Sequence, residues 1–284
     1  MRNPDYQLFI LWHKSLEYKE KLYEIISENF EIVHFDKLFW KTEQKYDNLS
    51  RLYFSIKKSK TSYKISYKGK NPFILVIVVD KYPRFSLRHN INGNIPLVNQ
   101  NITDLKDTLR NFVGGNYIHS TDNFYEFINQ CAMILGVEDT KQILASNSLH
   151  KVNNFDNIEF KENNLVGYDG FENYNQLLDL LNLTNNYVLL RESFSNGNIH
   201  LIILTDKKNM LLSTIGSRVE NNKRVLVVSN QKITLEISEL NDSSLDPLFQ
   251  KHILDTKVMI ENRFTLNQKV KGFYLLYNFL LKKV

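Results

Sequence analysis

An unbroken apolar run at residues 73–79 (FILVIVV) restricts the fold of this chain more than any other feature of the sequence. A strand that is apolar on both faces must be covered on both faces, so this run predicts a central strand within a layered domain. Strand-like and helix-like patterns alternate around it, with strands expected at residues 8–12 and 30–40 and helices from Ser15 and at residues 42–54. We therefore expect the first half to form a sheet with helices packed against it.

The second half of the chain begins a new set of elements, and no repeat relates it to the first half. Its strands are expected at residues 187–191, 199–204, 224–229 and 232–238. A closing helix follows an apolar stripe that starts at Val270. Strands and helices are thus mixed in both halves, which predicts the α+β class.

The best candidate for a connection between two domains is the segment at residues 146–164. This segment is rich in asparagine and charge and has no hydrophobic period, which is typical of a linker or of a compact loop between domains. We predict one domain at residues 1–149 and a second at residues 165–284, joined by a linker at residues 150–164.

Charge and cysteine content restrict the partners and the compartment. A formal net charge of +5 with a pI near 9.0 permits anionic ligands such as nucleotides or sugar phosphates and does not demand nucleic acid. The single cysteine, Cys131, excludes an internal disulfide and fits a reducing compartment. The sequence has no signal-peptide pattern and no apolar run of about 20 residues. We therefore expect a cytoplasmic protein without a membrane span.

The clearest functional signal is at residues 114–123 (GGNYIHSTDN), which directly precede an amphipathic helix pattern that Gly136 closes. Asp122 or Thr121 is expected to cap this helix, which would place His119 just before the helix N-terminus. The unpaired N–H groups and the helix dipole attract phosphate there, and an adjacent imidazole can act as a nucleophile or a general acid. The alternative is a histidine that only caps a loop.

The first half resembles nucleoside-diphosphate kinases in its order of elements and in an Asn-x-x-His loop that opens a helix. Asn116, His119 and Asp122 match the family motif Asn-x-x-His-Gly-Ser-Asp-Ser. Ser120 and Thr121 stand where that motif has glycine and serine, and together with Asp122 they are predicted to bind phosphate.

This resemblance covers residues 7–136 and implies roles for three residues. His119 would accept the phosphoryl group, Asn116 would bind ribose or phosphate, and Arg110 would grip the phosphate. Two positions depart from the family pattern. Lys14 lies near the place of a phosphate-binding lysine, displaced along the chain, and Gln130 replaces a glutamate that orients the histidine. An amide can hold an imidazole N–H but does not stabilise an imidazolium as a carboxylate does.

Residues 166–281 resemble the nucleotidyltransferase-like part of uncharacterised bacterial surface-polysaccharide biosynthesis proteins. The resemblance depends on residues 170–173 (GFEN), 187–191 (YVLLR) and 196–201 (NGNIHL). Relatives carry Gly-Asp-Ile-Asp-Leu at the last of these places, where two carboxylates and a third from a neighbouring strand would hold Mg²⁺. The two resemblances imply a ferredoxin-like or nucleoside-diphosphate-kinase-like sheet with helices, followed by a nucleotidyltransferase-like mixed sheet with helices.

The metal-binding positions of that second pattern are degenerate in this chain. Asn198 and His200 replace the two carboxylates, and Glu236 is the remaining candidate for the third. Asparagine and histidine do not supply the anionic oxygens that Mg²⁺ prefers, so we predict no resident metal. A softer metal held by His200 and Glu236 is the alternative.

Lysines interleaved with tyrosines at residues 57–70 form a further pattern. Such a segment can contact single-stranded nucleic acid, or it can form an edge strand whose lysines prevent pairing with other chains. We favour the edge strand and expect no nucleic-acid partner.

These features predict a transferase component of bacterial surface-polysaccharide biosynthesis that handles a nucleotide or a sugar phosphate, with His119 at a phosphate site. Glycosyltransferases or other polysaccharide-assembly proteins are its expected partners, and Mg²⁺ would accompany a bound nucleotide. The alternative is a nucleotide-binding pseudoenzyme that acts as a partner or regulatory subunit, because both predicted sites depart from their family patterns.

Overall fold

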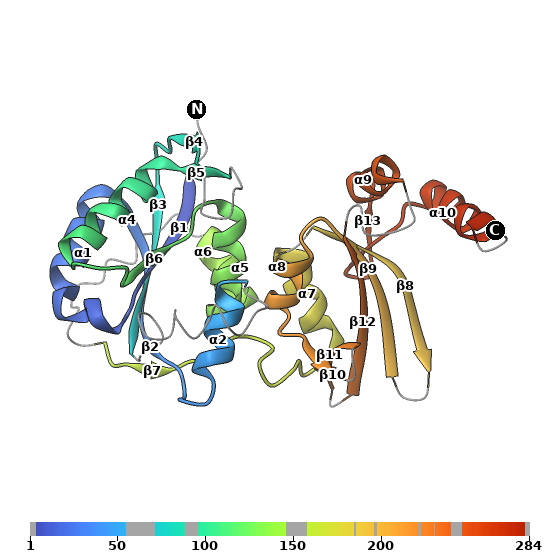
Figure 1. The fold of residues 1–284 in the computed structure, drawn as a ribbon, viewed down its shortest axis with the longest axis horizontal. Coiled ribbons are helices and arrows are strands. Elements are labelled where there is room, and N and C mark those ends of the chain that lie inside the picture. Colours follow the sequence, from blue (N-terminus) through green and yellow to red (C-terminus); the bar gives the residue numbers. More distant parts are fainter. Residues whose placement is uncertain are drawn as a thin grey trace. The chain divides into compact units, whose positions relative to one another are not determined.

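The protein belongs to the α+β class and forms two compact units, Met1–Leu165 and Val166–Val284 (Figure 1). The computed structural model describes residues 4–54, 72–88, 96–145, 158–184, 186–195, 198–220, 223–229, 231–239 and 246–281. The lysine-rich segment at residues 57–70 lies outside these described residues.

The first unit alternates strands and helices, as the sequence predicts. Its elements are β1 (Asp5–Leu11), the 3₁₀ helix η1 (His13–Tyr18), α1 (Lys19–Asn29), β2 (Glu31–Phe39), α2 (Lys45–Leu52), β3 (Phe73–Asp80), β4 (Phe85–Leu87), β5 (Leu97–Asn99), α4 (Gln100–Phe112), β6 (Ile118–Ser120), α5 (Phe124–Leu135), α6 (Val137–Ala145) and β7 (Lys161–Glu162). The helix expected from Ser15 therefore starts as a 3₁₀ turn and continues as α1.

The main sheet of this unit has the strand order β6-β1-β3-β2-β7. The first four strands are antiparallel to their neighbours, which is the arrangement of a ferredoxin-like split βαβ unit, and β7 adds in parallel to β2. Every residue of β3 is buried. The prediction of a central strand at residues 73–79 is therefore confirmed.

Helices cover both faces of this sheet. Figure 1 shows α1 and α4 on one face and α5 and α6 on the other. On the α1 and α4 face, the core includes Phe9, Val76 and Leu109. On the opposite face, the buried rings of Trp12, Trp40 and Phe73 pack with centroids 4.8 to 5.9 Å apart. These two cores fix the positions of β1 and β6 between the helices.

Helix α5 ends where the sequence predicts. Gly136 has a φ of +93°, a conformation that a residue with a Cβ rarely adopts, and its N–H donates to the carbonyl of Ala132 at 3.0 Å. The following helix α6 therefore starts at Val137 in a new direction. Cys131 lies on the buried side of α5, where burial raises the pKa of its thiol to about 12, so the thiol is unreactive at neutral pH.

The described end of the predicted linker packs on the first unit. β7 pairs with β2, and the side chain of Asn163 accepts a hydrogen bond from Trp40 Nε1 at 3.3 Å and donates to the carbonyl of Ile134 at 2.9 Å. The side chain of Asn48 donates to Asn164 at 3.0 Å. The asparagines that suggest a linker by composition thus anchor this stretch to the sheet.

The second unit contains a larger mixed sheet with helices. Its elements are α7 (Tyr174–Thr184), β8 (Tyr187–Ser195), β9 (Asn198–Thr205), α8 (Lys208–Thr214), β10 (Arg218–Glu220), β11 (Lys223–Val228), β12 (Gln231–Glu239), α9 (Pro247–Asp255), β13 (Val258–Ile260), β14 (Arg263–Thr265) and α10 (Gln268–Leu281). The four strands expected from the sequence correspond to β8, β9, β11 and β12.

The strand order of this second sheet is β10-β11-β12-β9-β8-β14-β13. β12 pairs with β9 in parallel and β8 pairs with β9 antiparallel, so the sheet is mixed, as predicted. Val188 and Leu204 form a buried core with residues of α9 and the start of α10. Figure 1 shows α7 and α8 on the other side of this sheet. Within the described part of the chain, no helix has the length and apolar character that crossing a bilayer requires.

Candidate functional site

His119 lies in the middle of the short edge strand β6, where it pairs with Ile10 of β1. The prediction that it occupies a loop just before the helix is therefore wrong. Three residues are too few for a strand pattern to be visible in the sequence, and pairing with β1 decides their conformation. His119 is 6% exposed, and its ring lies on the face of the sheet that α2 and α5 cover, because it contacts side chains from both helices.

A buried hydrogen-bond relay fixes the orientation of the imidazole. His119 Nε2 lies 2.8 Å from Gln130 Oε1, while Gln130 Nε2 donates to the carbonyl of Leu52 at 3.0 Å and to Glu126 Oε1 at 3.1 Å. Because both amide hydrogens of Gln130 have acceptors, its Oε1 is the acceptor for His119. This network assigns a proton to Nε2, so chemistry at His119 would use Nδ1.

Tyr53 and Arg110 also lie near this relay. We call the five residues His119, Gln130, Glu126, Tyr53 and Arg110 the His119 cluster. The Tyr53 ring packs edge-on against the imidazole with centroids 4.9 Å apart. Glu126 Oε1 lies 3.9 Å from His119 Nε2, which places a carboxylate beside the ring. Burial raises the pKa of the Tyr53 hydroxyl, an effect that Trp12 and Arg110 oppose, so the phenol stays neutral.

Arg110 reaches β6 from the C-terminal end of α4. Its Nε donates to the carbonyl of Ile118 at 2.9 Å, on the open edge of the strand. Burial lowers the pKa of Arg110, whereas Tyr53 and Asp107 oppose this shift, and the guanidinium remains a cation. Arg110 is therefore beside the strand of His119, and one of its donors holds the backbone of that strand. Its predicted contact with phosphate stays a prediction.

The N-terminus of α5 differs from the predicted phosphate cradle. Its N-cap is Asn123, whose side chain accepts from Glu126 N at 3.0 Å, and Glu126 Oε2 accepts from Asp122 N at 2.9 Å. The prediction of Asp122 or Thr121 as the cap is therefore wrong. This capping box uses backbone N–H groups that would otherwise be free to donate hydrogen bonds to a phosphate. The Asp122 carboxylate in turn pairs with Lys106 Nζ at 2.7 Å.

The remaining motif residues are dispersed. Thr121 is buried, and its hydroxyl donates to Gln7 Oε1 at 2.5 Å and accepts from Leu8 N at 3.1 Å, so it holds β6 on β1 and the prediction that it binds phosphate is wrong. Ser120 is also buried, and its hydroxyl has no hydrogen-bond partner among the described residues. Asn116 is exposed in the turn before β6.

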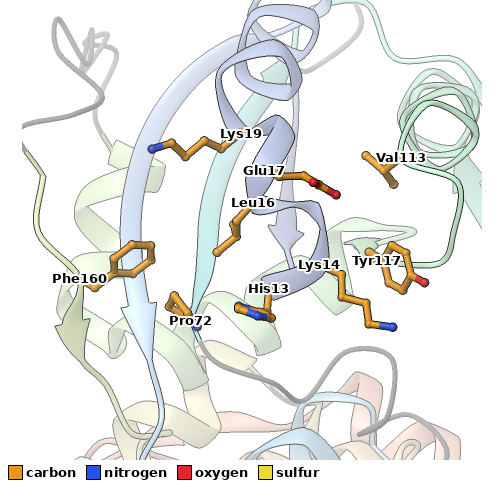
Figure 2. Close-up of a pocket in the computed structure, with 9 residues that line it drawn as sticks. All are labelled: His13, Lys14, Leu16, Glu17, Lys19, Pro72, Val113, Tyr117 and Phe160. Atoms are coloured by element: carbon orange, nitrogen blue, oxygen red, sulfur yellow. The ribbon is translucent and has the colours of Figure 1, made fainter.

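Lys14 belongs to a different place in the first unit. It lies in η1, and its Nζ is 5.0 Å from the centroid of the Tyr117 ring. Lys14 lines a cavity of about 690 Å³ that His119 does not line (Figure 2). The sequence thus predicts a basic residue near the end of β1, but the structure does not bring Lys14 together with His119.

The predicted metal positions of the second unit lie on two parallel strands. His200 of β9 pairs with Thr234 of β12, and Glu236 pairs with Ile202, two residues further along. The side chains of Asn198 and Glu236 lie outside the described residues. Among the side chains that the structure does describe, no group of three His, Cys, Asp or Glu residues is placed to hold a metal ion.

Sequence reasoning missed two members of the His119 cluster, Tyr53 and Glu126. Glu126 precedes Gln130 by four residues, the spacing that brings side chains together on a helix, and this spacing was visible in the sequence. Tyr53 gives no such signal, because it is distant in the chain from His119 and only the packing of α2 on the sheet brings it close.

Comparisons with known proteins provide no family assignment. No protein-family model matches this chain, and neither a curated protein nor a solved structure matches it. The strand order of the first unit and the contacts of His119 are therefore the observations from which function can be argued.

Proposed function

We propose that this chain is a transferase component that handles a nucleotide or a sugar phosphate, and that His119 accepts a phosphoryl group at Nδ1. The observation that carries the proposal is the hydrogen bond of 2.8 Å that joins His119 Nε2 to Gln130, with Glu126 as the next member of the relay. The proposed setting, assembly of a bacterial surface polysaccharide with glycosyltransferase partners, rests on the resemblance of the second half alone. Mg²⁺ would arrive with the nucleotide.

The chemistry follows from the tautomer. The Nδ1 lone pair would attack phosphorus while the bond between phosphorus and the leaving oxygen breaks and the leaving group takes that electron pair. The proton stays on Nε2, so the phosphorylated ring carries a positive charge. The carboxylate of Glu126, 3.9 Å from Nε2, would stabilise that charge in a buried setting, where electrostatic interactions are strong. Arg110 would face the phosphoryl oxygens.

The test is direct detection of phosphohistidine. The purified chain is incubated with radiolabelled phosphoramidate. This phosphoryl donor is small, which suits a histidine that is only 6% exposed. A separate sample is incubated with nucleoside triphosphates labelled at the γ position. We expect a label that is stable in alkali and lost in acid, present in His13→Ala and absent in His119→Ala. No label from either donor, or equal labelling of the two variants, would remove the proposal.

The role of Glu126 gives a second, finer test. In Glu126→Gln we expect the rate of labelling by phosphoramidate to fall about tenfold or more, because the positive ring loses its carboxylate. The matched control is Asn123→Ala, which removes the cap at the same helix end without changing the relay. If the two variants slow labelling equally, the effect belongs to the helix end and not to the charge of Glu126.

A nucleotide-binding pseudoenzyme is the second candidate. It is favoured by the neutral amide of Gln130, whose Oε1 contacts His119 where a carboxylate would stabilise a charged ring. The residue that touches His119 Nε2 is a neutral amide, and the capping box occupies donors at the start of α5. This candidate predicts that nucleotides raise the unfolding midpoint without any label or turnover, because a ligand of the native state stabilises it. Labelling at His119 would decide for the transferase.

A further inference from the structure

A cavity in the first unit has the chemistry of a ligand site. It has a volume of about 690 Å³, within the range of about 300–1,000 Å³ that is usual for small-molecule sites. Its lining comes from η1, from the first residue of α1, from the turn between α4 and β6, from the residue before β3 and from the residue before β7. These residues are His13, Lys14, Leu16, Glu17, Lys19, Pro72, Val113, Tyr117 and Phe160.

One part of the cavity is apolar and includes an aromatic ring. Figure 2 shows Leu16, Pro72 and Phe160 facing the same space from three different segments of the chain. Phe160 is 39% exposed and lines the cavity, so part of its side chain is accessible to a ligand. Lys37 Nζ lies 5.7 Å from the centroid of that ring, and such a contact places a positive charge next to the aromatic surface.

The other part of the cavity is basic. Figure 2 shows His13 and Lys14 at one end, with the Lys14 side chain beside the Tyr117 ring, 5.0 Å from its centroid. Lys19 and Glu17 also line the cavity, and Lys19 pairs with Glu20 at 3.2 Å. Because Lys19 pairs with Glu20, the basic character of the cavity comes mainly from the His13 and Lys14 end. An anionic group would therefore bind at the end formed by His13 and Lys14.

We infer that this cavity binds a phosphate monoester of a nucleoside, with its phosphate at His13 and Lys14 and its base against Phe160. The apolar part is close to the basic end, as a ligand with a charged group and a planar ring requires. A bare phosphate would leave the apolar part unused, and an uncharged aromatic compound would leave the lysine and histidine unused. The site is separate from His119, which does not line the cavity, so this inference is independent of the proposed function.

The experiment compares three probes that contain the base, the phosphate or both. Binding of adenosine 5′-monophosphate, adenosine and ribose 5-phosphate to the full chain is measured by titration calorimetry. We expect the monophosphate to bind most tightly. Lys14→Gln should weaken it about tenfold or more and leave adenosine unchanged, because only the contact with the charged group is lost. Phe160→Ser should weaken the monophosphate and adenosine alike by about fivefold or more, because base stacking is lost.

Matched controls separate local effects from misfolding. Lys21→Gln changes an exposed lysine of α1 that pairs with Glu24 and does not line the cavity, and it should bind the monophosphate like the wild-type chain. His119→Ala should also bind it normally, even if every test of phosphohistidine fails. The circular dichroism spectra and unfolding midpoints of Lys14→Gln and Phe160→Ser should match the wild type, since Lys14 and Phe160 are exposed at the surface.

Three results would overturn the inference. The first is no saturable binding of any probe. The second is equal affinity of Lys14→Gln and Lys21→Gln for the monophosphate. The third is loss of binding in His119→Ala together with normal binding in Lys14→Gln, which would place the ligand at His119. Equal affinity for ribose 5-phosphate and the monophosphate would overturn the assignment of the base to Phe160.

Discussion

Two buried polar networks of the first unit use an amide in opposite ways. In the Asp5–Asp80 cluster, formed by Asp5, Gln7, Asp80, Asn99, Asn101 and Thr121, Asn99 Nδ2 donates to both carboxylates at 2.9 and 3.0 Å. In the His119 cluster, Gln130 donates to a carboxylate and accepts from an imidazole. One amide thus joins two groups of the same sign, and the other joins a base to an acid.

This difference separates a structural network from one suited to chemistry. Asp5 and Asp80 are each 5% exposed, and among the described residues neither carboxylate has an ion-pair partner, so neutral amides alone stabilise them. Such a network holds β1, β3 and the start of α4 together, but it contains no basic group that could receive a proton or a phosphoryl group. The His119 cluster contains a basic nitrogen with a carboxylate 3.9 Å away, and Arg110 holds the backbone of the strand that carries this histidine.

The largest effect is expected from Asn99→Ala. This change removes one hydrogen-bond donor from each of two buried carboxylates, Asp5 and Asp80. It also removes the N-cap of α4, where Asn101 N donates to Asn99 Oδ1 at 3.0 Å. We expect the free energy of unfolding to fall by about 3–5 kcal/mol, measured by urea titration. Asn111→Ala, at an exposed position of the same helix, is the control. A loss below about 1 kcal/mol would mean that the carboxylates do not depend on Asn99.

A smaller loss is expected when the amide of the His119 cluster is removed. Gln130→Leu leaves His119 Nε2 and the carbonyl of Leu52 without the partner that Gln130 provides, so we expect stability to fall by about 2–3 kcal/mol. Urea unfolding of this variant and of Gln176→Leu, an exposed glutamine at the start of α7, measures the difference. Equal losses would show that the relay does not stabilise the fold.

Thr121→Val tests the link between the two networks. The Thr121 hydroxyl donates to Gln7, and Gln7 Nε2 donates to Asp5 at 2.7 Å, so the Asp5–Asp80 cluster extends to the strand that carries His119. We expect a loss of about 1–2 kcal/mol and unchanged labelling of His119, because the histidine side chain lies on the other face of the sheet. Thr108→Val, at an exposed threonine of α4, is the control. Loss of labelling in Thr121→Val would show that the two networks act together.

The smallest effect concerns the pH dependence of stability. Burial raises the pKa of Asp5, although hydrogen bonds from Asn99 and Gln7 oppose it, so the folded state binds this proton more tightly than the unfolded state. The favourable contribution is fully present below the ordinary aspartate pKa of 3.8 and is lost as the pH rises through the folded pKa. Asp5→Asn should therefore be more stable than the wild type at pH 7, and thermal unfolding at several pH values should show the difference vanish in acid.

Asp36 provides a control of opposite sign in the same unit. Burial acts to raise the pKa of Asp36, but hydrogen bonds from His34 and Lys161 outweigh it and the pKa is lowered. Its contribution is present above the ordinary aspartate pKa of 3.8 and is lost as the pH falls through the folded pKa. Asp36→Asn should therefore be less stable than the wild type at pH 7. The same sign for both variants would contradict the comparison.

The long elements of the fold could be predicted from the sequence. The run at residues 73–79 forms β3, and Gly136 ends α5, because both signals are local. The strands β6, β13 and β14 have three residues each and carry no pattern of their own. At β13 and β14, Glu261 and Asn262 adopt positive φ values of 46° and 61°, as in the tight turn of a hairpin, and an Asn-Gly pair that would announce it is missing.

The candidate site was predictable in its residue types more than in its contacts. Arg110 binds the backbone carbonyl of the residue before His119, whereas Lys14 lies elsewhere and Thr121 holds the sheet. The sequence suggests that Gln130 deprives the histidine of a carboxylate. The structure instead places Glu126 within 3.9 Å of it, because one helical turn separates the two side chains.

The sequence by itself determined the α+β class, the buried central strand and the helix that follows the histidine, since each follows from the spacing of apolar residues and from a glycine along a short stretch of chain. Only the tertiary structure decided which partners the polar side chains have. Gln130 meets the carbonyl of Leu52 and Asn99 meets Asp5 across 78 and 94 residues of chain. Such contacts depend on strand register and on the packing of helices against the sheet, which no local pattern specifies.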